Sequence, residues 1–449
     1  VIGPGGGRDI LLAMLAGSSD ITAVEINRSA VAAVKEFAGY NGDLYSLPGV
    51  NTVIRDGRNY IETTDRTFDT IYLSLVMTQA AETRSLALAE NYVYTSEAFT
   101  KYLSRLSNDG QVVFLTHDEN DAARIVATAL SVLGQEGISY ADATAHVSVV
   151  ATALPPGHAS PNHLHYPAVI IRKKAFTSLE SSTLYDVALR NGLDPVFIPG
   201  VVTSNRMPLT DFQSVDGLVK AATINIAPTT DERPFFYNFG AGTPLPIVIV
   251  VLAATGVLTV LFQPLYRTMQ GFTKRMAIYF FLLGIGYMAL ESALIQKNAL
   301  LLGHPTLSFL VSVPLLLGAS GTGSLLGARL RSRLKVVLVV LSMAILAAGA
   351  IYRWAMPYLL SSSPLSQVVV AALIVLPLGF LMGIPFPSGL SRMYDENVAS
   401  AIPLMWGLNG VASLLGSALA IIAATYFGFA ASFLIAALAY SLATRAYVA

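Results

Sequence analysis

The chain has 449 residues, no cysteine, and 28 basic residues against 28 acidic ones, so its formal net charge is zero. The lack of cysteine excludes disulfides, thiolate nucleophiles and cysteine-ligated metals, and the neutral balance gives no sign of a nucleic-acid partner. Hydrophobic residues make up 54% of the chain and charged residues only 12%, which is too apolar for an ordinary soluble protein of this size.

The apolar residues are concentrated in the second half. Charged residues are scattered up to about Phe239, whereas from Pro244 onward long uncharged runs alternate with short basic loops. We therefore predict a cofactor-binding α/β domain at 1–240 and an all-α transmembrane domain at 244–449. The dipeptide Val1-Ile2 is too short for a buried strand, so we also expect a missing N-terminal part.

In the first domain, strand-like and helical runs alternate, which is typical of a doubly wound α/β sheet. Two later apolar runs, at 146–153 and 168–172, should form an antiparallel pair. The predicted strands are 1–2, 21–25, 50–54, 68–75 and 111–116, and the predicted helices are 8–16, 30–40, 96–106 and 120–133.

A glycine-rich turn joins the first strand to the first helix. Gly3, Gly5 and Gly7 carry no Cβ, so backbone N–H groups and the helix N-terminus can approach a cofactor closely. Their spacing is one residue tighter than the dinucleotide fingerprint G-x-G-x-x-G. The turn therefore indicates a nucleotide-like cofactor of another kind.

Two acidic residues follow the turn, each at the end of one of the next two predicted strands. Glu25 ends the second strand, where its carboxylate can accept both hydroxyls of a ribose. Asp56 and Gly57 follow the third strand, where a carboxylate and a backbone N–H can read an adenine edge. A surface strand end and an ordinary Asp-Gly turn are the alternatives, but the three features together favour an adenosyl ligand.

Parts of the first domain resemble the S-adenosylmethionine-binding core of spermidine synthases, and more closely that of membrane-embedded spermidine synthase-like proteins. These parts are the segments 1–9, 21–27, 55–60 with 68–75, and 90–102. The resemblance to the membrane-embedded proteins continues later in the chain. It includes the motif Thr-Asp-Glu-Arg-Pro-Phe-Phe at 230–236 and the segments 284–296, 302–305, 382–390 and 406–417. It implies a class I methyltransferase-like Rossmann domain and transfer of an aminopropyl group from decarboxylated S-adenosylmethionine to an amine. The cofactor-binding positions it implies are Gly3, Gly5, Gly7, Glu25, Asp56 and Gly57.

Two departures from the family pattern concern the reaction. Aminopropyl-transferring members have an Asp after the glycine run that holds the cofactor's ammonium group; here Arg8 takes that position and Asp9 follows. They also have an Asp that accepts the amine's proton at the end of the fourth strand, where this chain has Ser74. Arg8 suits a carboxylate, which favours intact S-adenosylmethionine and a methyltransferase acting on a membrane-proximal substrate. Alternatively, Arg8 points to solvent and Asp9 takes over the missing role.

The segment 78–91 should overhang the cofactor as an acceptor gate. Glu90 is a candidate for binding a cationic acceptor and Tyr94 for orienting it, with Ser74 as the third catalytic candidate. Gln79, Glu82 and Tyr92 are further candidates near the same strand exit. We interpret His117, Asp118 and Glu119 as a helix cap, and we predict no metal at the loop histidines His158, His163 and His165.

The second domain contains seven runs long enough to span a bilayer, so we expect the lipid bilayer as a partner and allow for a homo-oligomer. Glu291 is the only acidic residue well inside a span, with Asn409 and Gln296 as candidate partners. Small residues indicate close helix packing, and prolines break the fifth run within 382–389. These features support a third function, a transporter or sensor regulated by the adenosyl domain. The runs are 246–262, 276–296, 306–328, 336–352, 367–385, 402–426 and 428–444.

The distribution of basic residues among the loops predicts a membrane sidedness that conflicts with the cytoplasmic location of the cofactor. Arginine and lysine are enriched in the first and third loops, while the second and fourth carry only Lys297 and Arg353. The positive-inside rule would then place the first domain outside the cell. Because S-adenosylmethionine is made in the cytoplasm, we instead expect a cell-membrane protein whose soluble domain is cytoplasmic.

Overall fold

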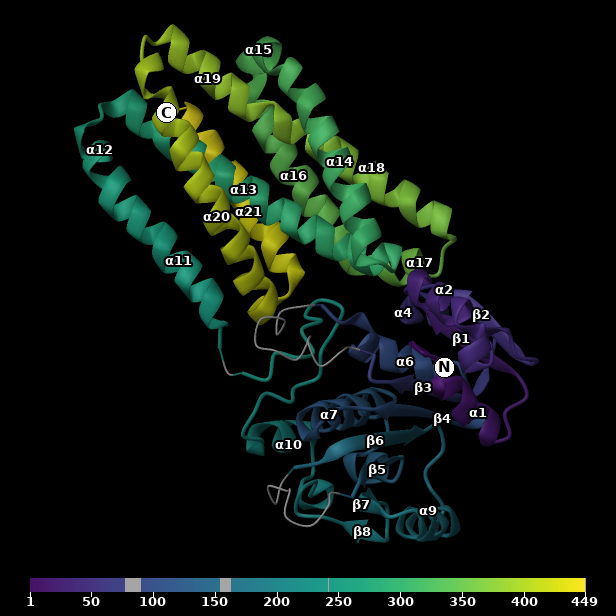
Figure 1. The fold of residues 1–449 in the computed structure, drawn as a ribbon. Coiled ribbons are helices and arrows are strands. Elements are labelled where there is room, and N and C mark those ends of the chain that lie inside the picture. Colours follow the sequence, from purple (N-terminus) through teal and green to yellow (C-terminus); the bar gives the residue numbers. More distant parts are fainter. Residues whose placement is uncertain (77–89, 154–162, 241, 449) are drawn as a thin grey trace. The chain divides into compact units, whose positions relative to one another are not determined.

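The computed structural model describes residues 1–76, 90–153, 163–240 and 242–448. The chain forms two compact units, Val1–Gly242 and Thr243–Ala449. The first unit contains a sheet and helices, and the second is helical (Figure 1).

The parallel part of the sheet has Ile2 at its centre. Strand β1 (Ile21–Glu25) pairs in parallel with β2 (Val50–Ile54), and β3 (Phe68–Ser74) with β4 (Leu106–Leu115). Ile2 forms parallel bridges to both β1 and β3 and so joins the two pairs. The chain passes from Ile2 to β1 on one side and later returns to β3 on the other. Open α/β sheets bind ligands at the carboxyl edge of such a switch point.

Antiparallel strands complete the sheet in the order β4, β6 (His165–Arg172), β5 (Val147–Thr152), β7 (Leu193–Ile198) and β8 (Val202–Thr203). The predicted antiparallel pair is confirmed as β5 and β6. The last two strands were not predicted, because Asp194 and Pro195 in β7 are unfavourable in strands.

The helices and strands of this unit depart from prediction in several places. The helix expected at 30–40 starts earlier, where Asn27 accepts hydrogen bonds from Ser29 and Ala30, and it divides at Phe37. The strand expected at 111–116 begins at Leu106. Helix α4 was missed because its sequence is short and polar. The helices are α1 (Arg8–Leu15), α2 (Arg28–Glu36), α3 (Ala38–Asn41), α4 (Gly57–Thr63), α6 (Ser96–Ser104), α7 (Glu119–Gln135), α8 (Tyr140–Thr144), α9 (Ser178–Arg190) and α10 (Val215–Ala221), with 3₁₀ turns η1 (Leu44–Ser46), η2 (Tyr92–Tyr94) and η3 (Leu209–Asp211).

Arg124 of α7 anchors the end of the first unit. Its side chain is buried, donates hydrogen bonds to the backbone carbonyls of Phe235, Phe236, Asn225 and Asn238, and lies 4.5 Å from the Phe239 ring centroid. A buried guanidinium is costly unless its donors are satisfied. The two terminal nitrogens of Arg124 thus tie segment 225–239 to α7, although its Nε has no partner among the described residues.

In the described part of the second unit, seven helical segments are long and apolar enough to cross a membrane, the number expected from the sequence. Helix α13 extends beyond its predicted end, so Lys297 lies inside it rather than in a loop. Lys297 is buried, with its Nζ 5.3 Å from the Phe429 ring centroid. The segments are Leu245–Thr268 (α11, η4, α12), Gly271–Leu302 (α13), Pro305–Leu325 (α14), Arg331–Trp354 (η5, α16), Pro364–Asp395 (α18, α19), Ala399–Phe427 (η6, α20) and Phe429–Tyr447 (within α21), with α15 (Gly327–Leu330) and α17 (Met356–Leu360) between them.

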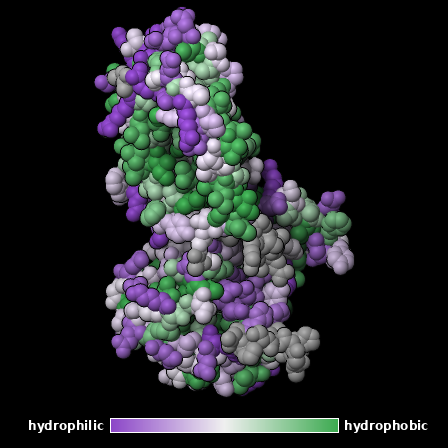
Figure 2. All heavy atoms as spheres, turned by 90° about the vertical axis from the view of Figure 1, so that its left-hand side faces the viewer, coloured by the Kyte–Doolittle hydropathy of each residue, from purple (hydrophilic) through white to green (hydrophobic). Residues whose placement is uncertain are grey.

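Hydrophobic side chains cover much of the visible side of this helical unit between its ends (Figure 2). Inside it, some of the small residues allow close packing. A Cβ at Gly323 of α14 would lie 2.0 Å from the Phe380 carbonyl oxygen of α18, and one at Gly383 would lie 1.9 Å from that of Ser320. Gly318 and Gly321 have no such neighbour within 4 Å, so only part of the predicted small-residue pattern is used for packing.

Candidate functional site

The glycine turn contains three left-handed residues, with φ of 68° at Gly3, 50° at Gly5 and 89° at Gly7. Gly7 immediately precedes α1, and a Cβ there would lie 2.8 Å from Leu44 Cδ1. A Cβ at Gly5 or Gly6 would meet nothing within 4 Å. Packing therefore accounts for glycine at Gly7, whereas open space lies beside Gly5 and Gly6.

Glu25 is tied directly to this turn. Its buried carboxylate accepts the Gly5 N–H on Oε2 at 3.0 Å and the Asn27 N–H on Oε1 at 2.9 Å. Each carboxylate oxygen can accept a second hydrogen bond. Glu25 thus fixes the turn to β1 and retains capacity for further donors.

Tyr45 also contacts the glycine turn, which the sequence did not predict. Its hydroxyl donates to the Gly5 carbonyl oxygen at 2.8 Å, so Gly5 is held from both sides. Burial, with the nearby charges of Glu25 and Asp9, raises the pKa of Tyr45. No motif marks this tyrosine, because it approaches the turn only through the 3₁₀ turn at Leu44–Ser46.

Asp56 and Gly57 also lie at the carboxyl edge of the parallel strands, directly after β2. Asp56 caps α4 by accepting the Asn59 N–H at 2.8 Å. A Cβ at Gly57 would lie 2.3 Å from Ile2 Cγ2. Both residues therefore have a structural role, and their contact with an adenine stays a prediction.

Arg8 and Asp9 have opposite environments. The Arg8 side chain is 70% exposed, and that of Asp9 is 7% exposed. Arg8 Nε lies 3.9 Å from Asp9 Oδ1, which has no hydrogen-bond partner among the described residues. Burial raises the pKa of Asp9, while a hydrogen bond from Ser74 and the charge of Arg8 oppose the rise. The structure thus brings Asp9 together with Ser74, the buried last residue of β3.

Tyr94 lies close to the end of β3 but within the aromatic core. Its hydroxyl forms hydrogen bonds with the Val76 backbone and with Tyr237, and burial raises its pKa. Its ring stacks on Phe236 with 4.3 Å between centroids. Glu90 is partly exposed, beside Tyr92. The roles of Glu90 and Tyr94 stay predictions, and Gln79, Glu82 and most of the expected gate lie outside the described residues.

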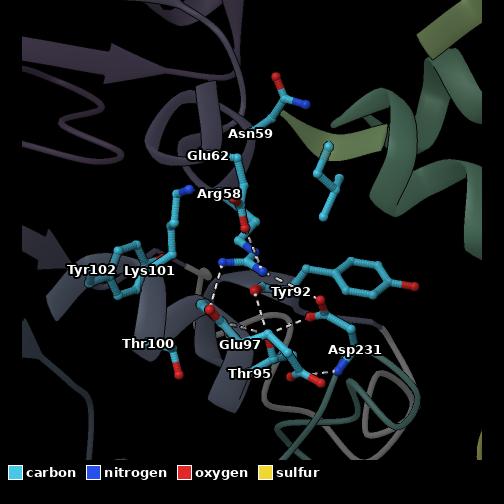
Figure 3. Close-up of polar contacts among 12 residues, drawn as sticks. Arg58, Asn59, Glu62, Tyr92, Thr95, Glu97, Thr100, Lys101, Tyr102 and Asp231 are labelled. Atoms are coloured by element: carbon cyan, nitrogen blue, oxygen red, sulfur yellow. Dashed lines mark hydrogen bonds and ion pairs between the residues drawn. The ribbon is translucent and has the colours of Figure 1, made fainter. Parts of the chain in front are cut away.

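A buried ionic network not predicted from the sequence lies at α4 and α6 (Figure 3). Arg58 of α4 is 3% exposed and contacts Glu62 at 2.9 Å and Asp231 at 3.4 Å. Asp231 also accepts the Thr95 hydroxyl at 2.6 Å, and its N–H donates to Glu97. The motif at 230–236 is therefore anchored to both helices through its aspartate.

The residues after β4 form a helix cap, as interpreted from the sequence. Asp118 accepts the N–H groups of Asn120 and Asp121 at the start of α7. Glu119 lies 2.9 Å from His163 Nδ1, and His158 lies outside the described residues. Among the residues that are described, no group of three His, Asp or Glu side chains is arranged to hold a metal ion.

The two membrane candidates have separate environments. Asn409 of α20 donates its amide to the Phe280 carbonyl oxygen at 2.8 Å, which gives it a partner other than Glu291. Glu291 is partly exposed on α13, one helical turn after Tyr287.

No family model matches the chain, and no curated protein matches it. Among solved structures, spermidine synthase from Thermotoga maritima is similar with a TM-score of 0.28 and 15% identity, over 40% of this chain and 53% of that one. A spermidine synthase in complex with the transition state analogue AdoDATO gives a TM-score of 0.27 and 15% identity, over 40% and 54%. The chain thus covers about half the length of each solved structure, and the similarity is weak.

Proposed function

We propose that this chain is an integral-membrane transferase that binds an S-adenosylmethionine-type cofactor at the glycine turn. The observation that carries the proposal is the hydrogen bond between Gly5 and Glu25 at the carboxyl edge of the parallel strands, together with the buried Asp9 beside Ser74 at the end of β3. The second unit supports the membrane assignment by the length and composition of its helices.

The residues present fit an adenosyl cofactor. The space beside Gly5 and Gly6 leaves room for a ligand close to backbone N–H groups. Glu25 has acceptor capacity for the ribose hydroxyls, and we assign Asp56 and Gly57 to the adenine edge. The cofactor would supply an electrophilic carbon attached to its sulfonium.

We propose aminopropyl transfer as the reaction, with Asp9 holding the cationic amino group of decarboxylated S-adenosylmethionine. The support is that Asp9 is buried with one oxygen unpartnered, whereas Arg8 is largely exposed. A charge-assisted hydrogen bond would satisfy that oxygen. Ser74 would orient the reacting groups, since a hydroxyl is a poor proton acceptor, and positioning would supply much of the rate.

A methyltransferase is the second candidate. The exposed Arg8 guanidinium has only a 3.9 Å contact with Asp9, so it is available for the carboxylate of intact S-adenosylmethionine. In both cases we place the first unit in the cytoplasm, where the cofactor is made. The acceptor would be a small amine or a membrane-proximal molecule, near Glu90 and Tyr94.

Mass spectrometry of products tests the proposal. The full chain in lipid nanodiscs is incubated with intact or decarboxylated S-adenosylmethionine and with putrescine or spermidine. We expect a product heavier by an aminopropyl group only with the decarboxylated form. Asp9→Asn should strongly reduce the yield of this product at cofactor concentrations below saturation, and Arg8→Gln should not.

The opposite pattern, a methylated product that depends on Arg8, would establish the methyltransferase instead. Isothermal titration calorimetry with both cofactor forms provides the broader test. If neither form binds, the proposed transferase is wrong.

A further inference from the structure

The helical unit contains a cavity of about 530 Å³ lined by residues of α13, α14, α18, α19, α20 and α21. Gly383, Phe386 and Pro387 on its wall lie where α18 ends and α19 begins. Proline has no N–H, so Pro387 cannot donate to the Gly383 carbonyl. Broken helices are tolerated at membrane depth where they line a cavity, which supports a binding space rather than a packing defect.

The wall carries no acidic, basic or histidine side chain among the residues that the structure describes. Its surface is largely aromatic and aliphatic, with Tyr287, Phe386, Trp406 and Tyr440 among the contributors. An anion bound in such a space would lack a cationic partner, at a high free-energy cost. The wall therefore selects against phosphate headgroups and carboxylates, and it offers an ammonium ion aromatic faces but no carboxylate and no acceptor that a quaternary ammonium could donate to.

Several polar side chains on the wall, including those of Asn409, Ser320 and Ser413, retain unused hydrogen-bonding capacity. Asn409 gives its amide N–H to the Phe280 carbonyl, which can only accept, so this bond fixes the orientation of the amide. Within the described chain, its Oδ1 and the hydroxyls of Ser320 and Ser413 make no hydrogen bond. Ser324 differs, because it donates to the Gly321 carbonyl at 2.7 Å. An amide oxygen only accepts, so a ligand must bring a donor.

We propose that this cavity binds a neutral amphiphile from the bilayer, an apolar chain or ring bearing a hydroxyl that donates to Asn409 Oδ1 and interacts with Ser320 and Ser413. Trp406 lines the cavity and is also 58% exposed, so the cavity opens at the surface of the bundle. The site is independent of the glycine turn and of the proposed transfer reaction.

Tryptophan fluorescence gives a direct test, because the chain has only two tryptophans. Trp354→Phe leaves Trp406 as the sole tryptophan in the full chain, which is reconstituted in phosphatidylcholine nanodiscs. The probe is a brominated long-chain alcohol, compared with a carboxylate and a quaternary ammonium of the same chain. We expect saturable quenching by the alcohol and only non-saturable quenching, linear in probe content, by the charged probes.

Cavity variants separate specific binding from partition into the bilayer. Ser413→Phe should remove the saturable component, while Leu414→Phe, at the next and 48% exposed position, should preserve it. Ser320→Ala should weaken the apparent affinity about threefold, the usual effect of one hydrogen bond between membrane helices. Linear quenching by the alcohol, equal quenching by all three probes, or retained saturation in Ser413→Phe would each overturn the proposal.

Discussion

Glu25 accepts a hydrogen bond from the Gly5 N–H at 3.0 Å, although the two residues are 20 positions apart in sequence. The contact joins the end of β1 to the left-handed turn that follows Ile2. One side chain thus shapes the turn and presents a carboxylate at the carboxyl edge of the sheet.

Glu25→Ala should weaken both the fold and cofactor binding. It leaves the N–H groups of Gly5 and Asn27 without their acceptor, which should lower the free energy of unfolding by about 1–3 kcal/mol. Calorimetric titration with decarboxylated S-adenosylmethionine should show loss of binding. Asp20→Ala, at the exposed residue before the same strand, is the control for affinity; unchanged affinity in Glu25→Ala would contradict the assignment.

Gly7→Ala should destabilise the first unit for two separable reasons. A left-handed backbone costs an alanine about 1–2 kcal/mol, and the new Cβ would lie 2.8 Å from Leu44 Cδ1. Gly17 has nearly the same φ, +88°, with nothing within 4 Å. Gly17→Ala should therefore show only the backbone cost in chemical denaturation, and Leu44→Ala should rescue part of the Gly7→Ala loss. Equal losses for the two glycine variants would exclude the packing argument.

Asp9→Asn should raise the stability of the first unit at neutral pH while weakening cofactor binding. Burial raises the pKa of Asp9 in the folded chain, so its contribution to stability is fully present below its unfolded pKa of 3.8 and is lost as pH rises through the folded pKa. The variant, which has no such group, should be the more stable protein at neutral pH. Denaturation at a series of pH values should show the difference growing as pH rises from 4.

The same variant should bind decarboxylated S-adenosylmethionine about 10- to 100-fold more weakly, as expected for loss of one charge-assisted hydrogen bond. Titration calorimetry of wild type and variant at pH 7 measures this ratio. Equal affinity would show that Asp9 does not hold the amino group.

Gly323→Ala should disrupt the contact between α14 and α18, whereas Gly321→Ala on the same helix should be tolerated. The new Cβ would lie 2.0 Å from the Phe380 carbonyl oxygen in the first variant and would meet nothing within 4 Å in the second. Overpacking of this kind costs about 1–3 kcal/mol. Thermal unfolding in nanodiscs should separate the two, and similar transitions would count against the observed helix contact.

Local sequence was sufficient where an element forms from its own residues. Strands β1 and β2 begin and end where the apolar runs predict. It failed for α4, whose polar sequence starts at the cap residue Asp56. Capping and burial on one face stabilise such a short helix, and neither produces a strong hydrophobic period.

The sequence by itself determined the division into a polar and a lipid-compatible half, the glycine turn and the acidic residues that follow it, because these depend on composition and short-range spacing. Only the tertiary structure decided that Asp9 is buried while Arg8 is exposed, that Tyr45 holds Gly5, and that Asp231 contacts Arg58. The physical reason is that burial and hydrogen bonding depend on partners distant in sequence. Asp231 and Arg58, for example, are separated by 173 positions.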